Sequence, residues 1–221
     1  MSGDDAASRF AERMASALHG LDGRRIAIVA TGSLTAAHLP YWLTYVGETG
    51  ARPEVRVLLT RSATRMVSPT VVSSLLGRPV EIDAWPDDEV LDHAPHVELA
   101  EWADGFLLHP CTFSYLGRLA TGLADTPAQL AMQCSVAPKV VCPSLPPGTT
   151  AAPAYQAHAR ALADRPDVVL LPPGRGRSAT TGRDDALPPA HFPLALAALG
   201  QELLARQDGS GPASPAAPVA S

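Results

Sequence analysis

The sequence predicts an α/β protein with a doubly wound parallel sheet in a single domain. Strand-like runs alternate with helical stretches along the chain, and most of these runs are apolar at successive positions. Such runs belong to strands that helices cover on both faces, as in parallel sheets with right-handed crossovers. A length of 221 residues suits one sizeable core and is short for two.

Each predicted element is a run of uniform character bounded by turn residues. Strands are expected at residues 24–30, 54–60, 80–85, 105–110, 139–143 and 167–173. Helices are expected at residues 33–50, 68–77, 112–125, 154–165 and 192–207. The domain should span residues 22–207. Residues 1–21 are predicted to form an N-terminal extension with a loosely attached helix, and the low-complexity residues 208–221 a disordered tail.

Composition and charge exclude several classes of function. A net charge of −5 and a pI near 5.8 leave no basic face for nucleic acid. The first twenty residues lack the basic and apolar regions of a signal peptide, and no apolar run approaches the roughly 20 residues of a membrane span, so a cytoplasmic protein is expected. Cys111, Cys134 and Cys142 have no metal-ligand or disulfide spacing and are predicted to be small buried residues, with no metal bound.

Hydroxyl-rich turns follow the first two predicted strands. Gly32 and Ser33 lie in "ATGSLTA" after the first strand, and Thr60 and Ser62 lie in "LLTRSAT" after the second. Parallel α/β sheets bind ligands at the carboxyl ends of their strands, so these two turns could hold one phosphate together with free helix amides. The "TGS" segment is neither a dinucleotide fingerprint nor a Walker loop, and an ordinary βα turn is the alternative.

The segment "HVELAEWADGFLLHP" at residues 96–110 begins with a histidine whose role is open on its own evidence. A lone histidine is more often structural or on the surface than catalytic. An imidazole nevertheless exchanges protons near neutral pH, which suits a general base. His93, three residues earlier, is predicted to be a loop residue.

Several motifs, taken in their order along the chain, resemble the homo-oligomeric flavin-containing cysteine decarboxylases. They are "TGSLTAAHLP", "LTRSA", "HVEL" with "WAD" behind it, and "HP" followed by "LGRLATGLAD", within residues 24–145. The resemblance implies a flavodoxin-like Rossmann fold, FMN bound at the strand ends, and homotrimers or dodecamers of trimers. The family includes phosphopantothenoylcysteine decarboxylases and the peptidyl-cysteine decarboxylases that tailor lanthipeptides and related ribosomally made peptides.

The resemblance also assigns roles to positions of this chain. His96 matches the active-site base. Where the family reads "PASANT" this chain reads "PCTFSY", which places Pro110, Cys111, Thr112 and Ser114 against the flavin, with Ser114 replacing an asparagine that faces the substrate. A hydroxyl cannot present an amide's donor and acceptor together. Where the family reads "PAMN" this chain reads "PSLP", so that the substrate-binding positions are Leu145 and Pro146.

The implied reaction is oxidative decarboxylation of the C-terminal cysteine of a precursor peptide to an aminoenethiol, which could close an aminovinyl-cysteine ring. No cysteine follows Cys142, although coenzyme A pathway members carry a late cysteine. The glycine- and arginine-rich loop at residues 172–186, with Arg175, Arg177 and Arg183, is either a lid over a peptide or a solvated loop. The alternatives are a phosphopantothenoylcysteine decarboxylase, a flavin prenyltransferase, which lacks support because no "SMAT"-type sequence occurs, and a non-catalytic FMN-binding partner subunit.

Overall fold

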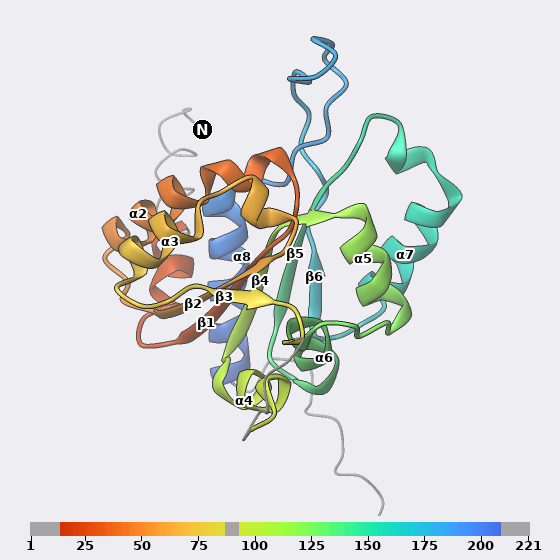
Figure 1. Ribbon diagram of the computed structural model, residues 1–221. Coiled ribbons are helices and arrows are strands. Elements are labelled where there is room, and N and C mark those ends of the chain that lie inside the picture. Colours follow the sequence, from red (N-terminus) through yellow and green to blue (C-terminus); the bar gives the residue numbers. More distant parts are fainter. Residues whose placement is uncertain (1–13, 87–92, 209–221) are drawn as a thin grey trace, which may run out of the picture.

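A single parallel sheet with helices on both faces forms the centre of the molecule (Figure 1). The computed structural model describes residues 14–86 and 93–208, and within them six strands lie in the order β3-β2-β1-β4-β5-β6. This order is that of the Rossmann fold, and it confirms the predicted doubly wound α/β class. The strands are β1 (Arg25–Ala30), β2 (Glu54–Thr60), β3 (Glu81–Asp83), β4 (Gly105–Thr112), β5 (Lys139–Ser144) and β6 (Val168–Leu170).

The helices begin where the sequence provides residues suited to a helix start. Pro69, Pro95, Pro127 and Pro153 each stand at the first position of a helix, where the missing amide costs nothing. The α-helices are α2 (Leu39–Glu48), α3 (Pro69–Leu76), α4 (Pro95–Trp102), α5 (Phe113–Thr121), α6 (Pro127–Cys134), α7 (Pro153–Ala163) and α8 (Phe192–Gln207). Short 3-10 turns are η1 (Leu34–His38), η2 (Ala63–Arg65) and η3 (Thr149–Ala151).

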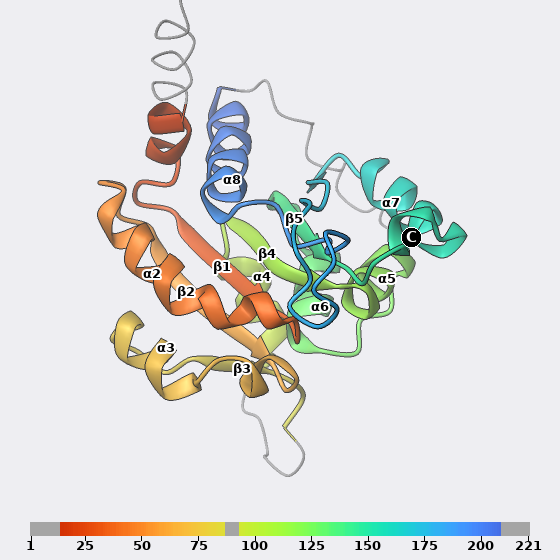
Figure 2. The same ribbon diagram turned by 90° about the horizontal axis from the view of Figure 1, so that it is seen from above.

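The core consists of two layers, one on each face of the sheet. Helices α2, α3 and α8 cover one face, while α4, α5, α6 and α7 cover the other (Figure 2). Strand β4 lies between β1 and β5, and successive residues enter opposite layers, as with Leu107 and Leu108, both fully buried. Its apolar sequence on both faces therefore follows from its central place in the sheet.

The sequence pattern missed two helices and extended the edge strands too far. Helices α4 and α6 have eight residues each and are less apolar than the equally short α3, so neither forms a distinct apolar segment in the sequence. The predicted strands at residues 80–85 and 167–173 are shortened to three residues each, in β3 and β6. These are the two edges of the sheet, where pairing exists on one side.

The described part of the N-terminal extension packs against the domain. Residues 14–19 are helical, and Leu18 and Leu21 are buried in the layer that contains α8. A Cβ on Gly200 of α8 would lie 1.8 Å from the carbonyl oxygen of Ala17, so the two helices meet at backbone contact. The expectation of a loosely attached helix is therefore wrong for these residues. Residues 1–13 and most of the predicted disordered tail, residues 209–221, lie outside the described residues.

Among the residues that the structure describes, no helix is both long and apolar enough to cross a membrane. Cys111 and Cys142 are buried as predicted, whereas Cys134, the last residue of α6, is exposed, so the prediction of burial was wrong there. No group of three or more histidine, cysteine, aspartate or glutamate residues within the described ranges could hold a metal ion.

Candidate functional site

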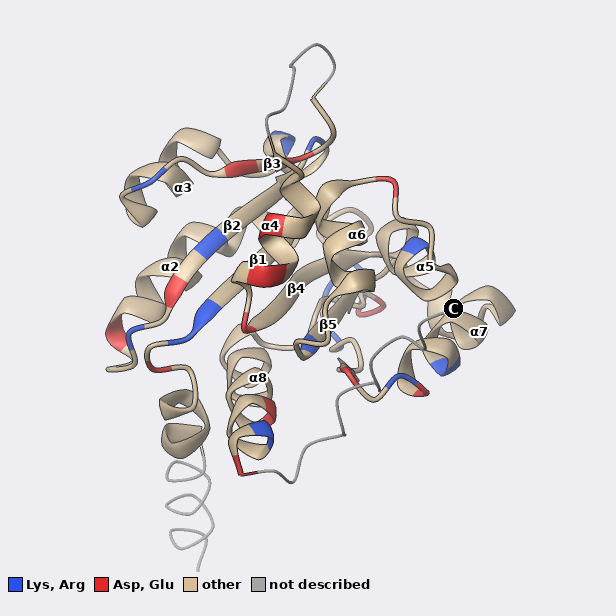
Figure 3. Ribbon diagram, turned by 90° about the horizontal axis from the view of Figure 1, so that it is seen from below, with Lys and Arg blue, Asp and Glu red and all other residues tan. Residues whose placement is uncertain are grey.

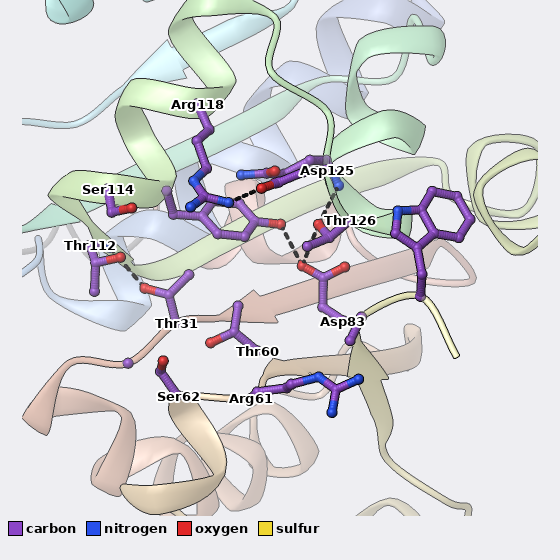
Figure 4. A pocket seen from close by; sticks show the side chains of 15 residues that line it. Thr31, Thr60, Arg61, Ser62, Asp83, Thr112, Ser114, Arg118, Asp125 and Thr126 are labelled. Atoms are coloured by element: carbon purple, nitrogen blue, oxygen red, sulfur yellow. Dashed lines mark hydrogen bonds and ion pairs between the residues drawn. The ribbon is translucent and has the colours of Figure 1, made fainter. Parts of the chain in front are cut away.

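A pocket of about 650 Å³ lies at the carboxyl ends of the strands, beside the point where the strand order reverses between β1 and β4 (Figure 4). This is the position at which α/β sheets of this kind bind ligands. The pocket is lined by residues after β1, β2, β3 and β4 and by the beginning of α6: Thr31, Gly32, Thr60, Arg61, Ser62, Asp83, Ala84, Trp85, Thr112, Ser114, Tyr115, Arg118, Asp125, Thr126 and Gln129.

The turns after β1 and β2 meet at Gly32. A Cβ at this position would lie 2.5 Å from Cβ of Ser62, which is closer than two carbon atoms can approach. A residue with a side chain would therefore force the two turns apart. The absence of a side chain lets both turns border the same pocket.

Two hydroxyl groups hold the walls of the pocket in place. Oγ1 of Thr31 donates a 2.8 Å bond to the carbonyl of Pro110 and accepts a 2.8 Å bond from the amide of Thr112, so it ties the end of β1 to the end of β4. Oγ1 of Thr60 accepts a 3.2 Å bond from the amide of Ala63 and so fixes the turn that begins η2. These threonines shape the pocket with hydrogen bonds inside the protein.

Other hydroxyls at the pocket stay available to a ligand. Ser62 and Thr112 precede η2 and α5, and neither side chain makes a capping bond to the turn that follows it. Ser114 is exposed in the first turn of α5. That turn contains no acidic residue, and the first amides of a helix lack partners within the helix and carry partial positive charge. This corner of the pocket is therefore suited to an anion.

The opposite side of the pocket contains a buried carboxyl group, Asp83, at the end of β3. Its Oδ2 accepts bonds from the hydroxyls of Tyr115, at 2.8 Å, and Thr126, at 2.9 Å, and its Oδ1 accepts a 2.9 Å bond from the amide of Ala128. Burial raises the pKa of Asp83 above its usual range, although these three donors act against the rise. Burial also raises the pKa of the Tyr115 hydroxyl, with Asp83 as a further cause.

Charged and aromatic groups complete the lining. Arg118 of α5 forms an ion pair with Asp125, and Figure 4 shows these two side chains together at one side of the pocket. Arg61 follows β2 and Trp85 follows β3, so the two are brought to the pocket by neighbouring strands. The pocket thus combines hydroxyls, two guanidinium groups, two carboxyls and one indole.

His96 lies beside the pocket and contacts it through Trp85. The two rings pack edge to face with their centroids 5.6 Å apart, and His96 is the second residue of α4. Nδ1 of His96 is buried and has no hydrogen-bond partner within the described part of the chain. The imidazole itself is not among the groups that line the pocket. His93 lies in a bend, as predicted, and is exposed.

The structure separates some predicted cofactor residues from the pocket lining. Oγ of Ser33 lies 2.8 Å from Oγ of Ser144 and 3.0 Å from Oγ1 of Thr35, so it is turned toward β5. Cys111 is fully buried, and burial raises the pKa of its thiol. Pro110 takes part through its carbonyl, which holds Thr31. Gly32, Thr60, Ser62, Thr112 and Ser114 are brought together in the pocket, as the sequence indicated.

The predicted substrate residues after β5 adjoin the loop at residues 172–186. The amide of Leu145 donates a 2.9 Å bond to the carbonyl of Leu187, and Leu145 is buried while Pro146 is exposed. The loop is a hairpin in which Gly176 and Ala186 form an antiparallel bridge, and it projects beyond the carboxyl ends of the strands in Figure 1. At its tip, Arg183 forms an ion pair of 2.7 Å with Asp185.

The side of the pocket that contains Asp83, Trp85 and Arg118 was not predicted from the sequence. A signal was available for the first two, because "IDAW" closes a predicted strand whose carboxyl end should face the ligand edge. Arg118 lies one helical turn after Ser114, on the same face of α5. Once the first residue of α5 is known, this spacing assigns Arg118 to the pocket lining.

Comparison with known proteins identifies the family. A family model described as Flavoprotein matches residues 14–187 of the chain. The chain belongs to the Flavoprotein family. This confirms the resemblance to the homo-oligomeric flavin-containing cysteine decarboxylases.

Matches to known proteins and solved structures extend over most of this chain. It is 30% identical over 179 residues to the cypemycin cysteine dehydrogenase (decarboxylating) of Streptomyces sp., with 80% of the chain and 90% of that protein covered. The crystal structure of the cypemycin decarboxylase CypD matches with a TM-score of 0.66 at 26% identity, covering 86% of the chain and 97% of that structure. The coenzyme A biosynthesis bifunctional protein CoaBC of Escherichia coli (strain K12) is 29% identical over 150 residues, which are 66% of the chain and 35% of that longer protein.

Proposed function

We propose that this protein binds FMN and oxidatively decarboxylates the C-terminal cysteine of a ribosomally made precursor peptide, giving an aminoenethiol for an aminovinyl-cysteine ring. The observation that carries the proposal is the pocket at the strand ends, which joins the turns after β1, β2 and β4 in a chain similar to a cypemycin cysteine dehydrogenase over most of both lengths.

The residues of the pocket fit FMN. The volume of the pocket, about 650 Å³, falls within the range of roughly 300–1,000 Å³ that small-molecule sites occupy. Gly32 and Ser62 approach closely and form a corner of the pocket. The hydroxyls there and the first amides of α5 would bind the single phosphate of FMN. The indole of Trp85 and the ring of Tyr115 offer apolar surface to a flat ring system.

FMN, when bound, supplies the two-electron oxidation that the reaction needs. The peptidyl cysteine loses carbon dioxide and two hydrogens and becomes the aminoenethiol. The two hydrogens leave as the two-electron equivalent that reduces the flavin. The residues of the chain bind and orient the reactants. Ser62, Thr112 and Ser114 would hold the cofactor, while the Asp83, Tyr115 and Thr126 network would fix the shape of the pocket floor.

His96 is the residue that we propose as the general base. Its position against Trp85 places it at the rim of the pocket, and its unpartnered Nδ1 leaves one ring nitrogen without a structural task in the described chain. Peptide contacts are assigned to Ser114, Leu145 and Pro146, with the hairpin at residues 172–186 beside them. Assembly into trimers, or dodecamers of trimers, is part of the proposal.

The second candidate is phosphopantothenoylcysteine decarboxylase, which the 29% identity to the coenzyme A biosynthesis protein favours. That match covers a smaller part of the chain than the match to the cypemycin enzyme. No cysteine follows Cys142 in the sequence, so the late cysteine expected of that branch is missing.

The test is turnover with matched peptides after loading with FMN. Peptides ending in cysteine should lose carbon dioxide and two hydrogens by mass spectrometry, while the same peptides ending in serine should stay intact, because an alcohol gives no thiocarbonyl to accept the electrons of decarboxylation. Phosphopantothenoylcysteine is measured in parallel. Preference for it would favour the second candidate, and FMN binding without turnover of either substrate would favour a non-catalytic partner subunit.

A further inference from the structure

A second cavity of about 360 Å³ lies at the amino-terminal edge of the sheet, opposite the flavin pocket. It is bordered by the residues that precede β1, β4 and β5 and by the carboxyl ends of α4 and α8. Figure 3 shows Lys and Arg at the beginnings of β1 and β5 and near the end of α8. The lining includes two arginines, Arg24 and Arg206, and an aliphatic part made by Ala100, Ala103, Val136 and Leu203.

Both arginines carry donors that nothing in the described chain satisfies. Nη2 of Arg24, and Nε and Nη2 of Arg206, are buried from solvent and have no hydrogen-bond partner. Nη1 of Arg206 donates a 2.7 Å bond to the carbonyl of Val136, which anchors that guanidinium at the cavity wall. Buried donors almost always have an acceptor, so three unsatisfied guanidinium nitrogens beside one cavity are donors that an oxyanion in that cavity would satisfy once the guanidinium groups turn toward it.

The carboxylate that lines this cavity is already paired. Asp104 accepts bonds from the amide of Arg25 at 2.8 Å and from its Nη2 at 3.1 Å. Burial alone would raise the pKa of Asp104, but the bonds from Arg25 hold it below its usual range. Asp104 is thus paired with Arg25, and the charge of Arg24 also acts on this carboxylate. Among the described residues, Asp104 is the one acidic residue of the cavity lining, beside two arginines of the lining and Arg25.

Basic residues at this edge could also serve to complement the carboxyl ends of helices, which carry partial negative charge. Lys139 does so: its Nζ donates to the carbonyls of Ser135, at 2.5 Å, and Ala137, at 2.8 Å, and to Asp167, at 2.6 Å. Arg206 donates through Nη1 alone to the carbonyl of Val136, two residues after the end of α6. Carbonyls beside a helix end thus account for one nitrogen of Arg206 and for no nitrogen of Arg24.

We propose that this second cavity binds a small organic anion, with its carboxylate or phosphate on Arg24 and Arg206 and a short aliphatic body against Ala103 and Leu203. Guanidinium groups present paired N–H donors that match both kinds of oxyanion. The site uses residues apart from the flavin pocket, so it is independent of the proposed function and its ligand does not compete with FMN.

The test is titration calorimetry of the full chain with sodium butyrate, its neutral isostere butyramide and inorganic phosphate, at constant ionic strength set with chloride. Each titration is run without FMN and with the flavin pocket saturated. We expect one saturable site per chain for butyrate or phosphate that remains when FMN saturates the flavin pocket, and no binding of butyramide. The tighter of the two anions then distinguishes a carboxylate from a phosphate ligand.

Four substitutions localise the site. Arg24→Gln and Arg206→Gln should each weaken anion binding at least tenfold, while Arg78→Gln removes an exposed arginine paired with Glu54 and should leave it unchanged. Arg206→Lys keeps the charge and a donor for Val136, so it guards against a loss caused by unfolding. Absence of saturable binding, equal binding of butyramide, displacement by FMN, or full affinity in both glutamine variants would overturn the proposal.

Discussion

The hydroxyl of Tyr115 on α5 donates a 2.8 Å hydrogen bond to Oδ2 of Asp83 at the end of β3. This bond crosses from the helix after the central strand to the edge strand of the sheet, and it joins two residues that line the pocket at the strand ends. Asp83 is 2% exposed, so the hydroxyl serves as one of its few solvating groups. The carboxyl and the phenol therefore depend on each other.

Tyr115→Phe should destabilise the protein by about 1–2 kcal/mol, because a buried carboxyl loses one of its three donors while the aromatic ring stays. Urea unfolding at pH 7 measures the change. Tyr155→Phe is the matched control: Tyr155 is 8% exposed, and its hydroxyl makes no hydrogen bond within the described residues. Equal losses in the two variants would contradict a special role for the bond to Asp83.

Asp83 should make stability depend on pH. Since burial raises its pKa in the folded state, the folded protein holds a proton that the unfolded chain has already released, over the window from the ordinary carboxyl range near pH 4 up to the raised pKa. Stability from this group is thus greatest below the window and falls as pH rises through it. Asp83→Asn should flatten that fall in urea unfolding series, and Asp164→Asn, at an exposed position after α7, should not.

The central strands of the sheet could be predicted from the sequence because the most continuous apolar runs belong to the most buried strands. Strand β4 is apolar over most of its length and lies between two partners, so its run was recognised almost completely. Strand β3 has one neighbour and three residues, and its end was placed two residues too late. The end of an edge strand depends on how far it pairs with its one neighbouring strand, and a local sequence pattern does not contain this pairing.

The candidate site could be predicted where a motif lies in one turn. Gly32, Thr60 and Ser62 were found because each lies at the end of a predicted strand or within two residues after it. The position of Asp83 near the end of a predicted strand was a signal that went unused, but its contacts could not be predicted, because Tyr115, Thr126 and Ala128 lie 32 to 45 residues away along the chain. Contacts of this kind arise from packing between helices and the sheet edge, and no spacing in the sequence encodes them.

Gly32→Ala should impair both folding and FMN binding. The added methyl would meet Cβ of Ser62 at 2.5 Å, and the overpacking should cost about 1–3 kcal/mol of stability and weaken FMN binding at least tenfold as the two turns separate. Fluorescence titration with FMN measures the affinity. Gly47→Ala in α2, where the methyl would meet nothing within 4 Å, should bind FMN like the parent and be slightly more stable.

Lys139 offers a test of buried charge outside the lining of the pocket at the carboxyl ends of the strands. Its side chain is fully buried, and burial lowers its pKa to about 8. Lys139→Met retains an apolar stem but leaves the carbonyls of Ser135 and Ala137 without their donor and Asp167 with Arg165 as its remaining ionic partner. A loss of about 2–4 kcal/mol is expected in urea unfolding at pH 7.

The control for Lys139 is an arginine whose ion pair is exposed. Arg78 pairs with Glu54 at 3.1 Å on the surface, and Arg78→Met should change stability by no more than about 0.5 kcal/mol. If Lys139→Met were as mild, the buried hydrogen bonds of the lysine would contribute nothing net to the fold.

His96→Asn tests the proposed base, with His93→Asn as its matched control. Both histidines precede or begin α4, but His96 packs against Trp85 at the pocket, whereas His93 is exposed in a bend. Asparagine keeps a polar group and cannot exchange a proton near neutral pH, so His96→Asn should retain FMN and lose at least about 10²-fold in kcat/KM on cysteine-terminated peptides, as expected for loss of general acid–base catalysis. His93→Asn should stay near the parent rate. Stopped-flow flavin reduction and mass spectrometry of the peptide measure the two variants under identical loading. Parent-like turnover by His96→Asn would make this imidazole a packing partner of Trp85, and the base would have to be sought among Asp83 and the other groups that line the pocket.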